Sequence, residues 1–171
     1  MHLSTRGRYA IMAMLDLAQL AAANRHAGVQ KPVTLAMIAE RQQISLSYLE
    51  QLFAKLRKAN VVGSTRGPGG GYVIPRNLHE ITLAEIVDAV DEVIDVTRCG
   101  DMHNPHGPKK GHGCVYGAKC NAHDLWTSLG KHIEGFMQQT TLQMVLDGKL
   151  PGLTGTAAVP AASGIRVHIR S

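Results

Sequence analysis

The chain has 171 residues, of which 44% are hydrophobic and 4% aromatic, and its formal net charge is +5. This length suits one domain, or one domain with an appendage. No apolar run approaches the roughly 20 residues needed to cross a bilayer, and the first residues lack the apolar core of a signal peptide. We therefore expect a cytoplasmic protein with no membrane partner. In that reducing compartment its three cysteines favour thiols, metal ligands or core residues over a disulfide framework.

Positive charge is concentrated in the first part of the chain. Residues 1–76 contain ten Lys and Arg but three Asp and Glu, whereas residues 77–98 contain six acidic residues and one Arg. Clustered Lys and Arg favour a polyanionic partner because they release counterions from phosphate backbones. A solvated basic surface is the alternative if this part lacks an element that reads nucleic acid.

Three helices are predicted in this basic part. Apolar residues at helical spacing indicate a first helix over residues 4–23, and Thr34 can cap a short second helix. Ser47 and Glu50 form a capping-box pattern, which predicts that the third helix begins near Ser47. That helix has a single apolar stripe at positions i, i+3, i+4 and i+7, namely Leu49, Leu52, Phe53 and Leu56. The last two helices together resemble a helix-turn-helix.

A β-hairpin is predicted directly after the third helix. Residues 61–66 and 72–74 indicate two strands, with Arg66 at the tip and four glycines in the turn over residues 67–71. A glycine-rich loop can also cradle phosphate, but no Lys-Ser/Thr pair opening a helix follows it here, which argues against a nucleotide site. A hairpin after a recognition-type helix is typical of a winged helix, whose wing can place a cation against a DNA groove.

An acidic helix is predicted beyond the wing. Thr82 and Glu85 form a second capping box, at the start of an amphipathic helix over residues 82–91. The acidic face of this helix is most simply solvated. It could also hold the basic N-terminal part by charge attraction.

A longer helix is predicted near the end of the chain. Asn121 is a candidate cap for a helix over residues 122–146. Its apolar residues, spaced mostly by three or four, are Leu125, Trp126, Leu129, Ile133, Phe136 and Met137. They suit either the chain's own core or a second copy, and we favour a dimer because winged-helix proteins generally read two half-sites. Residues 148–171, rich in small residues and proline, indicate a disordered tail.

The three cysteines lie near a histidine in sequence. Cys114, Cys120 and His123 form a Cys-x5-Cys-x2-His pattern, and a segment rich in Gly, Pro and His separates Cys99 from Cys114. Three thiolates and one imidazole suit either zinc or an iron–sulfur cluster, and the residues alone leave both open. The segment between the first two cysteines adds His103, His106 and His112, which are most simply solvated loop residues.

Several motifs resemble the IscR family of bacterial iron–sulfur cluster regulators. They are LSTRGRYA (residues 3–10), ISLSYLEQLF (44–53), LRK (56–58), RGPGGGY (66–72) and the Asp-Glu pair (91–92) before Thr97-Arg98-Cys99. The likeness extends to about residue 146 and leaves out the tail. It implies a homodimeric winged-helix transcription factor, repressor and activator, that binds double-stranded promoter DNA. It also implies that the protein senses cluster supply, controls cluster-assembly genes and receives its 2Fe-2S cluster from the assembly machinery.

The resemblance assigns DNA-binding roles by position. It implies that Ser45, Ser47, Tyr48 and Glu50 are recognition-helix contacts and that Arg66 reaches a minor groove. These roles are physically reasonable, because hydroxyls bind base edges or phosphates and Arg suits a narrow, electronegative minor groove. The simpler alternatives are that Ser47 and Glu50 only cap the helix and that Tyr48 flanks the core. Glu50, a carboxylate on a basic surface, can also act by excluding some DNA sites through repulsion.

The same resemblance implies that Cys99, Cys114, Cys120 and His123 are the ligands of the 2Fe-2S cluster. The first gap in this sequence is longer than is usual for the family. A related alternative is a nitric-oxide or redox sensor with a 4Fe-4S cluster. An enzymatic or electron-transfer role lacks support, since the sequence shows no nucleophile–base arrangement or cofactor loop.

We therefore expect a mainly α fold with a small β-hairpin wing, in which a winged helix-turn-helix is followed by a long C-terminal dimerisation helix. The expected segments are a DNA-binding domain (1–76), a linking helix (77–98), a cluster-binding loop (99–123), a dimerisation helix (124–147) and a disordered tail (148–171).

Overall fold

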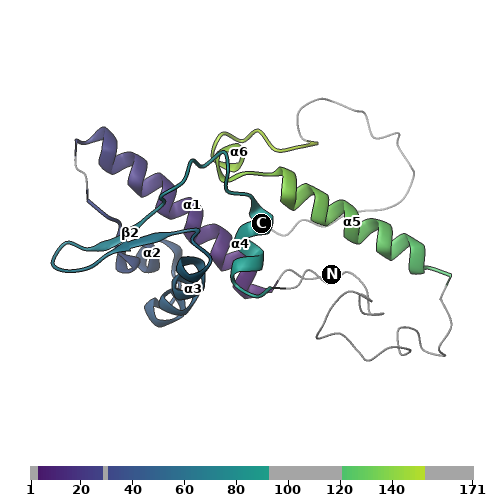
Figure 1. Cartoon of the computed structure of the whole chain (residues 1–171), viewed down its shortest axis with the longest axis horizontal. Coiled ribbons are helices and arrows are strands. Elements are labelled where there is room, and N and C mark those ends of the chain that lie inside the picture. Colours follow the sequence, from purple (N-terminus) through teal and green to yellow (C-terminus); the bar gives the residue numbers. More distant parts are fainter. Residues whose placement is uncertain (1–3, 29–30, 93–120, 153–171) are drawn as a thin grey trace.

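The computed structural model describes residues 4–28, 31–92 and 121–152. This part of the chain is mainly helical with one two-stranded antiparallel hairpin, which confirms the expected fold class (Figure 1). Its elements are α1 (Thr5–His26), α2 (Leu35–Gln42), α3 (Leu46–Lys58), β1 (Gly63–Thr65), β2 (Gly71–Val73), α4 (Leu83–Ala89), α5 (His123–Gln139) and α6 (Leu142–Leu146).

Helix α1 is about one turn longer than its sequence pattern predicts. The hydroxyl of Ser4 accepts the backbone N–H of Arg6 and caps the start, as is common for serine. The helix continues through the polar residues after Ala23 and ends at His26, before Gly28, which has a left-handed φ of +69°. Polar side chains do not by themselves end a helix, whereas a left-handed glycine does.

Helices α2 and α3 form the predicted helix-turn-helix. The N–H of Met37 donates to the Thr34 hydroxyl at 3.4 Å, which confirms Thr34 as the cap of α2. Gln43 ends α2 in a left-handed conformation with φ +54°, and the N–H of Ile44 then bonds to the carbonyl of Ala39. Because Ile44 is buried, this turn sets where α3 begins.

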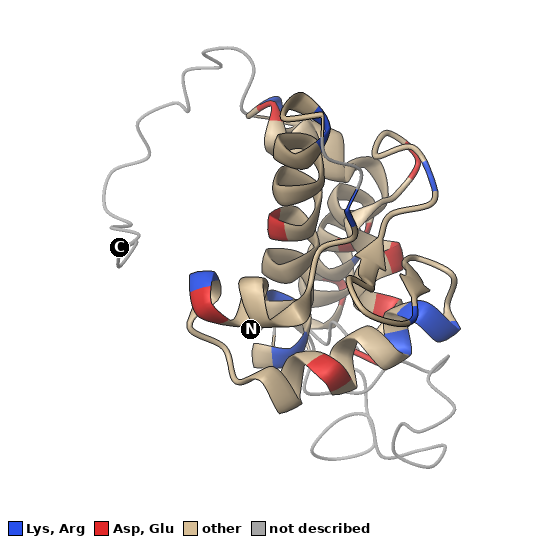
Figure 2. Cartoon of the chain, turned by 90° about the vertical axis from the view of Figure 1, so that its left-hand side faces the viewer, with Lys and Arg blue, Asp and Glu red and all other residues tan. Residues whose placement is uncertain are grey.

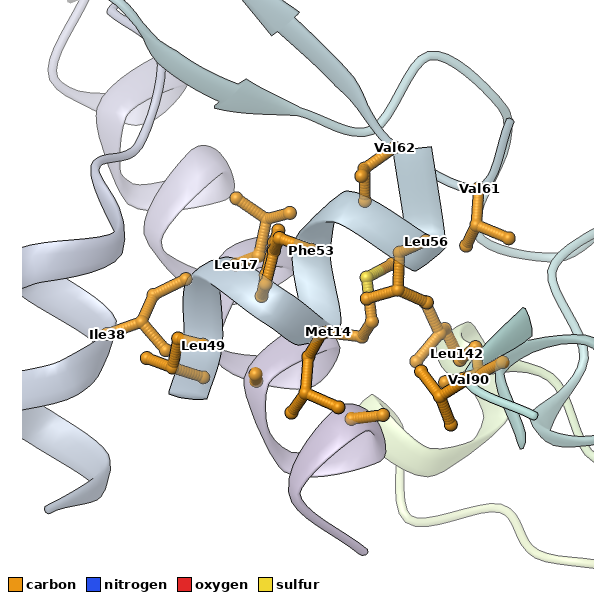
Figure 3. Close-up of a cluster of buried hydrophobic side chains, with 14 of the residues drawn as sticks. Met14, Leu17, Ile38, Leu49, Phe53, Leu56, Val61, Val62, Val90 and Leu142 are labelled. Carbon is orange, nitrogen blue, oxygen red and sulfur yellow. The ribbon is translucent and has the colours of Figure 1, made fainter. Parts of the chain in front are cut away.

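One hydrophobic core joins the first four helices and α6, and Met137 of α5 also belongs to it (Figure 3). The apolar stripe of α3 lies at its centre, in contact with residues from α1 and α2, as the spacing predicts. The fully buried side chains drawn there include Met14, Leu17, Ile38, Leu49, Phe53, Leu56, Val61 and Leu142. The third helix is therefore held on its buried face by residues from four other segments of the chain.

The wing is held close to α2 by backbone hydrogen bonds. Strands β1 and β2 pair from Gly63–Val73 to Thr65–Gly71, so they are shorter than the sequence pattern suggests. Val33, just before α2, exchanges two backbone hydrogen bonds with Tyr72, of 3.0 and 2.7 Å. A Cβ on Gly71 would lie 2.5 Å from the carbonyl oxygen of Val33, so this close approach requires glycine.

The predicted helix over residues 122–146 is divided into two, α5 and α6. Thr140 is buried and extended, and its carbonyl accepts the N–H of Leu83 at 2.9 Å. Leu142 in turn donates its N–H to the carbonyl of Ile81 at 2.9 Å. This bridge attaches α5 and α6 to the start of α4, whose cap at Thr82 accepts the N–H of Glu85 as predicted.

Figure 1 shows α5 extending away from the body formed by the other described elements. Only Met137 of this helix is buried. Among the residues that the structure describes, no helix combines the length and hydrophobicity needed to cross a membrane.

Candidate nucleic-acid interface and metal centre

The N-terminal end of α3 differs from its predicted form. Ser45, and not Ser47, is the N-cap, and its hydroxyl accepts the N–H of Tyr48 at 3.3 Å. The capping box of Ser47 and Glu50 is therefore not formed, because the turn before Ile44 starts the helix two residues earlier. Ser47 and Glu50 are exposed and make no side-chain hydrogen bond within the described residues. The capping explanation for these two residues is thus excluded by the helix start.

One side of α3 is exposed and polar. With about 100° between successive residues, Ser47, Glu50, Gln51 and Lys58 lie on the side opposite the buried stripe. All four are exposed. The three basic residues of the last turn are Lys55, Arg57 and Lys58, so positive charge gathers at the C-terminal end of the helix (Figure 2). A helix end with this charge distribution suits contact with a phosphate backbone.

Tyr48 is half-buried beside the exposed side of α3. Its ring meets that of Tyr9 from α1 edge to face, with 6.0 Å between centroids and an interplanar angle of 87°. The ring also packs against the core, as the simpler interpretation of this residue required. Tyr9 therefore orients Tyr48 from the neighbouring helix, an arrangement compatible with a structural role and with a hydroxyl that contacts DNA.

Arg66 lies at the tip of the wing and is exposed. The turn after it is compact, with left-handed Gly67 and Gly69 and a hydrogen bond from the N–H of Gly70 to the carbonyl of Gly67. On the inner side, the Arg57 guanidinium lies 3.4 Å from the hydroxyl of Ser64 in β1. The wing and α3 are thus connected by a side chain as well as by the core.

The predicted metal ligands are described only in part. His123 is the first residue of α5, while Cys99, Cys114 and Cys120 lie outside the described residues, as do the three loop histidines. The Nδ1 atom of His123 is buried and has no hydrogen-bond partner in the part of the chain described. A buried imidazole nitrogen normally finds a partner, and a metal ion is one of the partners that it commonly takes. The donor set of three thiols and this nitrogen fits an iron–sulfur cluster or zinc.

The start of α5 also bears on the chemistry of this site. Ala122 is the N-cap and makes no side-chain hydrogen bond, so Asn121 does not cap the helix as predicted. The predicted position of His123 in the first turn is confirmed. The helix dipole makes this end partly positive, which favours an anionic group nearby by about 0.3–1 kcal/mol, and Asp124 in the first turn already supplies one negative charge.

A polar junction at the end of α4 was not identified from the sequence. The ammonium group of Lys55 lies 2.9 Å from a carboxylate oxygen of Asp91, and this contact and the charge of Lys55 lower the pKa of Asp91. Glu92 accepts the backbone N–H of Ser4 at 2.8 Å and its hydroxyl at 2.5 Å. Arg76 also forms an ion pair with Glu85.

These contacts bear on whether the acidic residues of the predicted helix over residues 82–91 are simply solvated or attract the basic N-terminal part of the chain. Part of its charge does attract the basic N-terminal part of the chain, through Lys55 and Arg76. Residues of the junction belong to the motifs that carry the resemblance (3–10 and 91–92), but the only periodic signal for it is that Lys55 borders the buried stripe of α3. Its partner lies 36 residues away.

Known proteins match the chain over most of its length. It matches the Rrf2 family, described as iron-dependent transcriptional regulators, over residues 3–148. The HTH-type transcriptional regulator IscR of Salmonella paratyphi B is 46% identical over 170 residues, covering 96% of this chain and 93% of the relative. An HTH-type transcriptional regulator of Neisseria meningitidis is 45% identical, covering 89% of this chain and 92% of the relative.

Solved structures agree with these sequence matches. T. potens IscR superimposes with a TM-score of 0.61 at 31% identity, covering 86% of this chain and 88% of that one. CymR, the global cysteine regulator of B. subtilis, gives a TM-score of 0.64 at 25% identity, covering 86% of this chain and 98% of that one. These proteins share the winged-helix fold. The chain therefore belongs to the Rrf2 family of iron-dependent transcriptional regulators, and is a DNA-binding regulator of the IscR type.

Proposed function

We propose that this regulator is a homodimer that senses iron–sulfur cluster supply through a labile 2Fe-2S cluster and controls cluster-assembly genes. The ligands would be Cys99, Cys114, Cys120 and His123. The observation that carries this proposal is the buried Nδ1 of His123, which has no hydrogen-bond partner among the described residues and stands at the start of α5. The family's iron dependence favours a cluster over zinc at this donor set.

The charge of the proposed site suits its position. An oxidised 2Fe-2S core with three thiolates and a neutral imidazole carries a net charge of −1, and the uncapped start of α5 offers a partly positive helix end. When bound, the cluster supplies a redox-active group that, with one protonatable ligand, is lost more readily than an all-thiolate one. A labile cluster suits a sensor, because its occupancy can follow supply. The assembly machinery would be the donor.

DNA reading is proposed for the exposed side of α3 and for the wing. Ser45, Ser47 and Tyr48 present hydroxyls at the N-terminal end of α3, while Arg66 projects from the wing tip. Recognition helices typically contact base edges with residues of their first turns, and a wing arginine suits an adjacent minor groove. The absence of a capping box supports this assignment for Ser47 and Glu50, since neither side chain is engaged elsewhere in the described residues.

Glu50 is proposed to discriminate between DNA sites. It is an exposed carboxylate on a surface that otherwise carries Ser47, Gln51 and Lys58. A carboxylate can accept a hydrogen bond from cytosine N4 but repels phosphates and guanine acceptors, so it disfavours some sequences. The resemblance to the family implies two classes of promoter site, one read by the cluster-bound form and a second still read by the cluster-free form. Glu50→Ala in the cluster-free protein should therefore bind the first class more tightly than the wild type does. Unchanged discrimination between two site classes in a binding titration would refute this role.

Dimerisation is proposed through α5. Helical spacing places Leu125, Leu129 and Phe136 on one side of this helix, about 60° from Ile133 and about 100° from Met137, which pack against the core. Leu125 is 63% exposed and Phe136 is 40% exposed. An apolar stripe of this kind beside the chain's own core supports a second copy as its partner. Two copies would present two α3 helices to two half-sites of promoter DNA.

The cluster is tested on anaerobically purified protein. Visible absorption and Mössbauer spectra should show a 2Fe-2S cluster that is lost or altered in His123→Ala. The matched control is His132→Ala, which changes an exposed histidine on the same helix and should leave the spectra unchanged. Unaltered absorption in His123→Ala would refute the ligand assignment. A colourless zinc protein would refute the cluster, and a 4Fe-4S spectrum would favour a nitric-oxide or redox sensor.

The gene targets are tested separately, by footprinting on promoters of cluster-assembly genes with cluster-bound and cluster-free protein. Protection that changes with cluster occupancy is expected. Protection that is absent, or identical in both forms, would refute cluster-dependent control of these genes.

A further inference from the structure

The recognition helix is held on both edges by basic side chains. Lys55 and Arg57 lie about 80° to either side of the exposed face, one directed to the end of α4 and the other to the wing. We propose that Lys55 and Asp91 are positioning residues that transmit the state of the cluster segment to the recognition helix. This inference rests on the proposed function, and it concerns how the proposed cluster alters DNA reading.

Lys55 is directed away from the exposed face of α3. Its side chain is 39% exposed, and its ammonium group lies 2.9 Å from Asp91 Oδ2 and 3.5 Å from the carbonyl of Val90. Lys58, one turn later on the exposed face, makes no such contact within the described part of the chain. Lys55 is therefore placed to orient α3 relative to α4, whereas Lys58 is free to meet phosphate.

The end of α4 gives Lys55 a defined partner. The N–H of Asp91 bonds to the carbonyl of Asp88 at 3.0 Å, and that of Glu92 bonds to the carbonyl of Val87 at 3.2 Å. Together with the left-handed φ of +53° at Asp91, this is a Schellman ending. Glycine is the usual residue at this position, and aspartate tolerates it. The aspartate therefore adds a carboxylate directed at α3, which the helix ending itself does not require.

The start of α1 also meets this junction. Ser4 donates two hydrogen bonds to the Glu92 carboxylate, and the guanidinium of Arg6 lies 3.4–3.5 Å from the carbonyls of Asp91 and Val90. The residues from 90 to 92 thus contact the first turn of α1 and the last turn of α3 at the same time.

The junction is close in sequence to the first proposed ligand. Cys99 follows Glu92 by seven residues, which span at most about 25 Å when fully extended. A cluster that holds Cys99 therefore restrains the chain that leaves the junction. The restraint can alter DNA binding only if a contact between this chain and α3 differs between the cluster-bound and cluster-free forms. Among the described residues, Lys55 joins that chain to α3, most closely through the Asp91 carboxylate and also through the carbonyl of Val90.

The exposure of the pair sets the size of the expected effect. Asp91 is 77% exposed, so the pair is screened and each partner can be removed without leaving a buried charge. We expect a coupling of about two- to five-fold in DNA affinity, in the range of exposed ion pairs. Folding should be nearly unaffected.

The test uses the full-length chain in cluster-bound and cluster-free forms. DNA duplexes are selected from a random-sequence library by each wild-type form, and the dissociation constants of both forms are measured on both duplexes. On each duplex the wild-type dissociation constants of the two forms differ by some factor, which is the ratio compared here. This factor should become about two- to five-fold smaller in Lys55→Gln and in Asp91→Asn. Their combination should shrink it no further, because both remove one interaction. Lys55→Arg, which retains the pair, should restore the ratio.

Lys58→Gln is the matched control, because it removes a positive charge from the same turn of α3 while leaving the Lys55–Asp91 contact in place, and the charge of Lys58 is the weakest of the influences that lower the pKa of Asp91. It should weaken binding of both forms equally and reduce the salt dependence, leaving the ratio unchanged. Equal absorption by the clusters and equal thermal unfolding must accompany each comparison. A wild-type ratio preserved in Asp91→Asn, or additive effects in the double variant, would overturn the inference while the proposed function stands. A wild-type chain without a cluster, or with identical binding by both forms, overturns both.

Discussion

Helices α3 and α5 both carry apolar stripes, but the chain covers only one of them. Helix α3 has 13 residues and buries four, Leu49, Leu52, Phe53 and Leu56, whereas α5 has 17 residues and buries only Met137. The orientation of α3 is thus determined within a single chain. That of α5 depends on its contact with α4 and on its attachment through Thr140. A stripe at helical spacing therefore predicts that a surface is covered, but not by which molecule.

The largest change in the free energy of unfolding should come from substitutions on the buried side of α3. Phe53 is fully buried, and its ring packs edge to face on that of Tyr72 with 4.8 Å between the ring centroids. Phe53→Ala should therefore lower the free energy of unfolding by about 3–5 kcal/mol. Leu46→Ala, on the same helix but 43% exposed, should lower it by less than about 1 kcal/mol. Urea denaturation measures both. Equal losses would mean that the stripe is not the anchor of this helix.

A smaller effect is expected from the exposed stripe of α5. Phe136→Glu should weaken dimerisation by about 2 kcal/mol, roughly 30-fold, because a charge replaces an apolar contact at the proposed interface. Gln138→Glu adds the same charge on the opposite side of α5 and should leave the association constant unchanged. Sedimentation equilibrium measures both. If Phe136→Glu destabilises the monomer instead, the residue belongs to the chain's own core.

A smaller effect again is expected at the wing, whose tip is exposed and lies outside the core. Arg66→Ala should leave unfolding unchanged but weaken DNA binding by about 1 kcal/mol, roughly five-fold, and reduce the salt dependence by about one phosphate contact. Binding titrations at several salt concentrations measure this. Unchanged affinity and slope would show that the wing does not contact DNA.

The smallest effect concerns the contact between α4 and α5. Desolvation and the nearby charge of Glu134 raise the pKa of Asp88, although its side chain is exposed. Because the folded chain binds this proton more tightly than the unfolded chain, stability should fall as pH rises from the unfolded pKa through the folded one. Asp88→Asn should therefore stabilise the protein at pH 7, by at most about 0.5 kcal/mol after solvent screening. Thermal unfolding at pH 3 and pH 7 tests this, since the gain should vanish at pH 3.

The differences from the sequence expectations have one kind of cause. Ser45 and Ser47 are equally good caps by residue type, and the burial of Ile44 selects Ser45. Residues 122–146 have continuous helical spacing, yet backbone pairing with Ile81 and Leu83 divides them at Thr140. In both cases a contact between distant segments overrides a local preference.

The candidate site also has features that local sequence predicts and features that depend on contacts between distant segments. Residue types and spacing placed Arg66 at the tip of a hairpin and His123 in the first turn of a helix, whereas the DNA-binding roles came from the resemblance to a family. The orphaned Nδ1 of His123 and the contact between Lys55 and Asp91 required the packed chain. Neither the burial of one atom nor an ion pair across 36 residues leaves a periodic signal in the sequence.

The sequence by itself determined the order of the first four helices, the caps at Thr34 and Thr82, the wing and the basic charge of residues 1–76. Each of these depends on residues that are neighbours in the sequence. Only the tertiary structure decided where α3 begins, where α5 ends and which charges meet at the end of α4. These depend on which distant segments pack together, and burial and backbone pairing between such segments outweigh the small differences among local preferences.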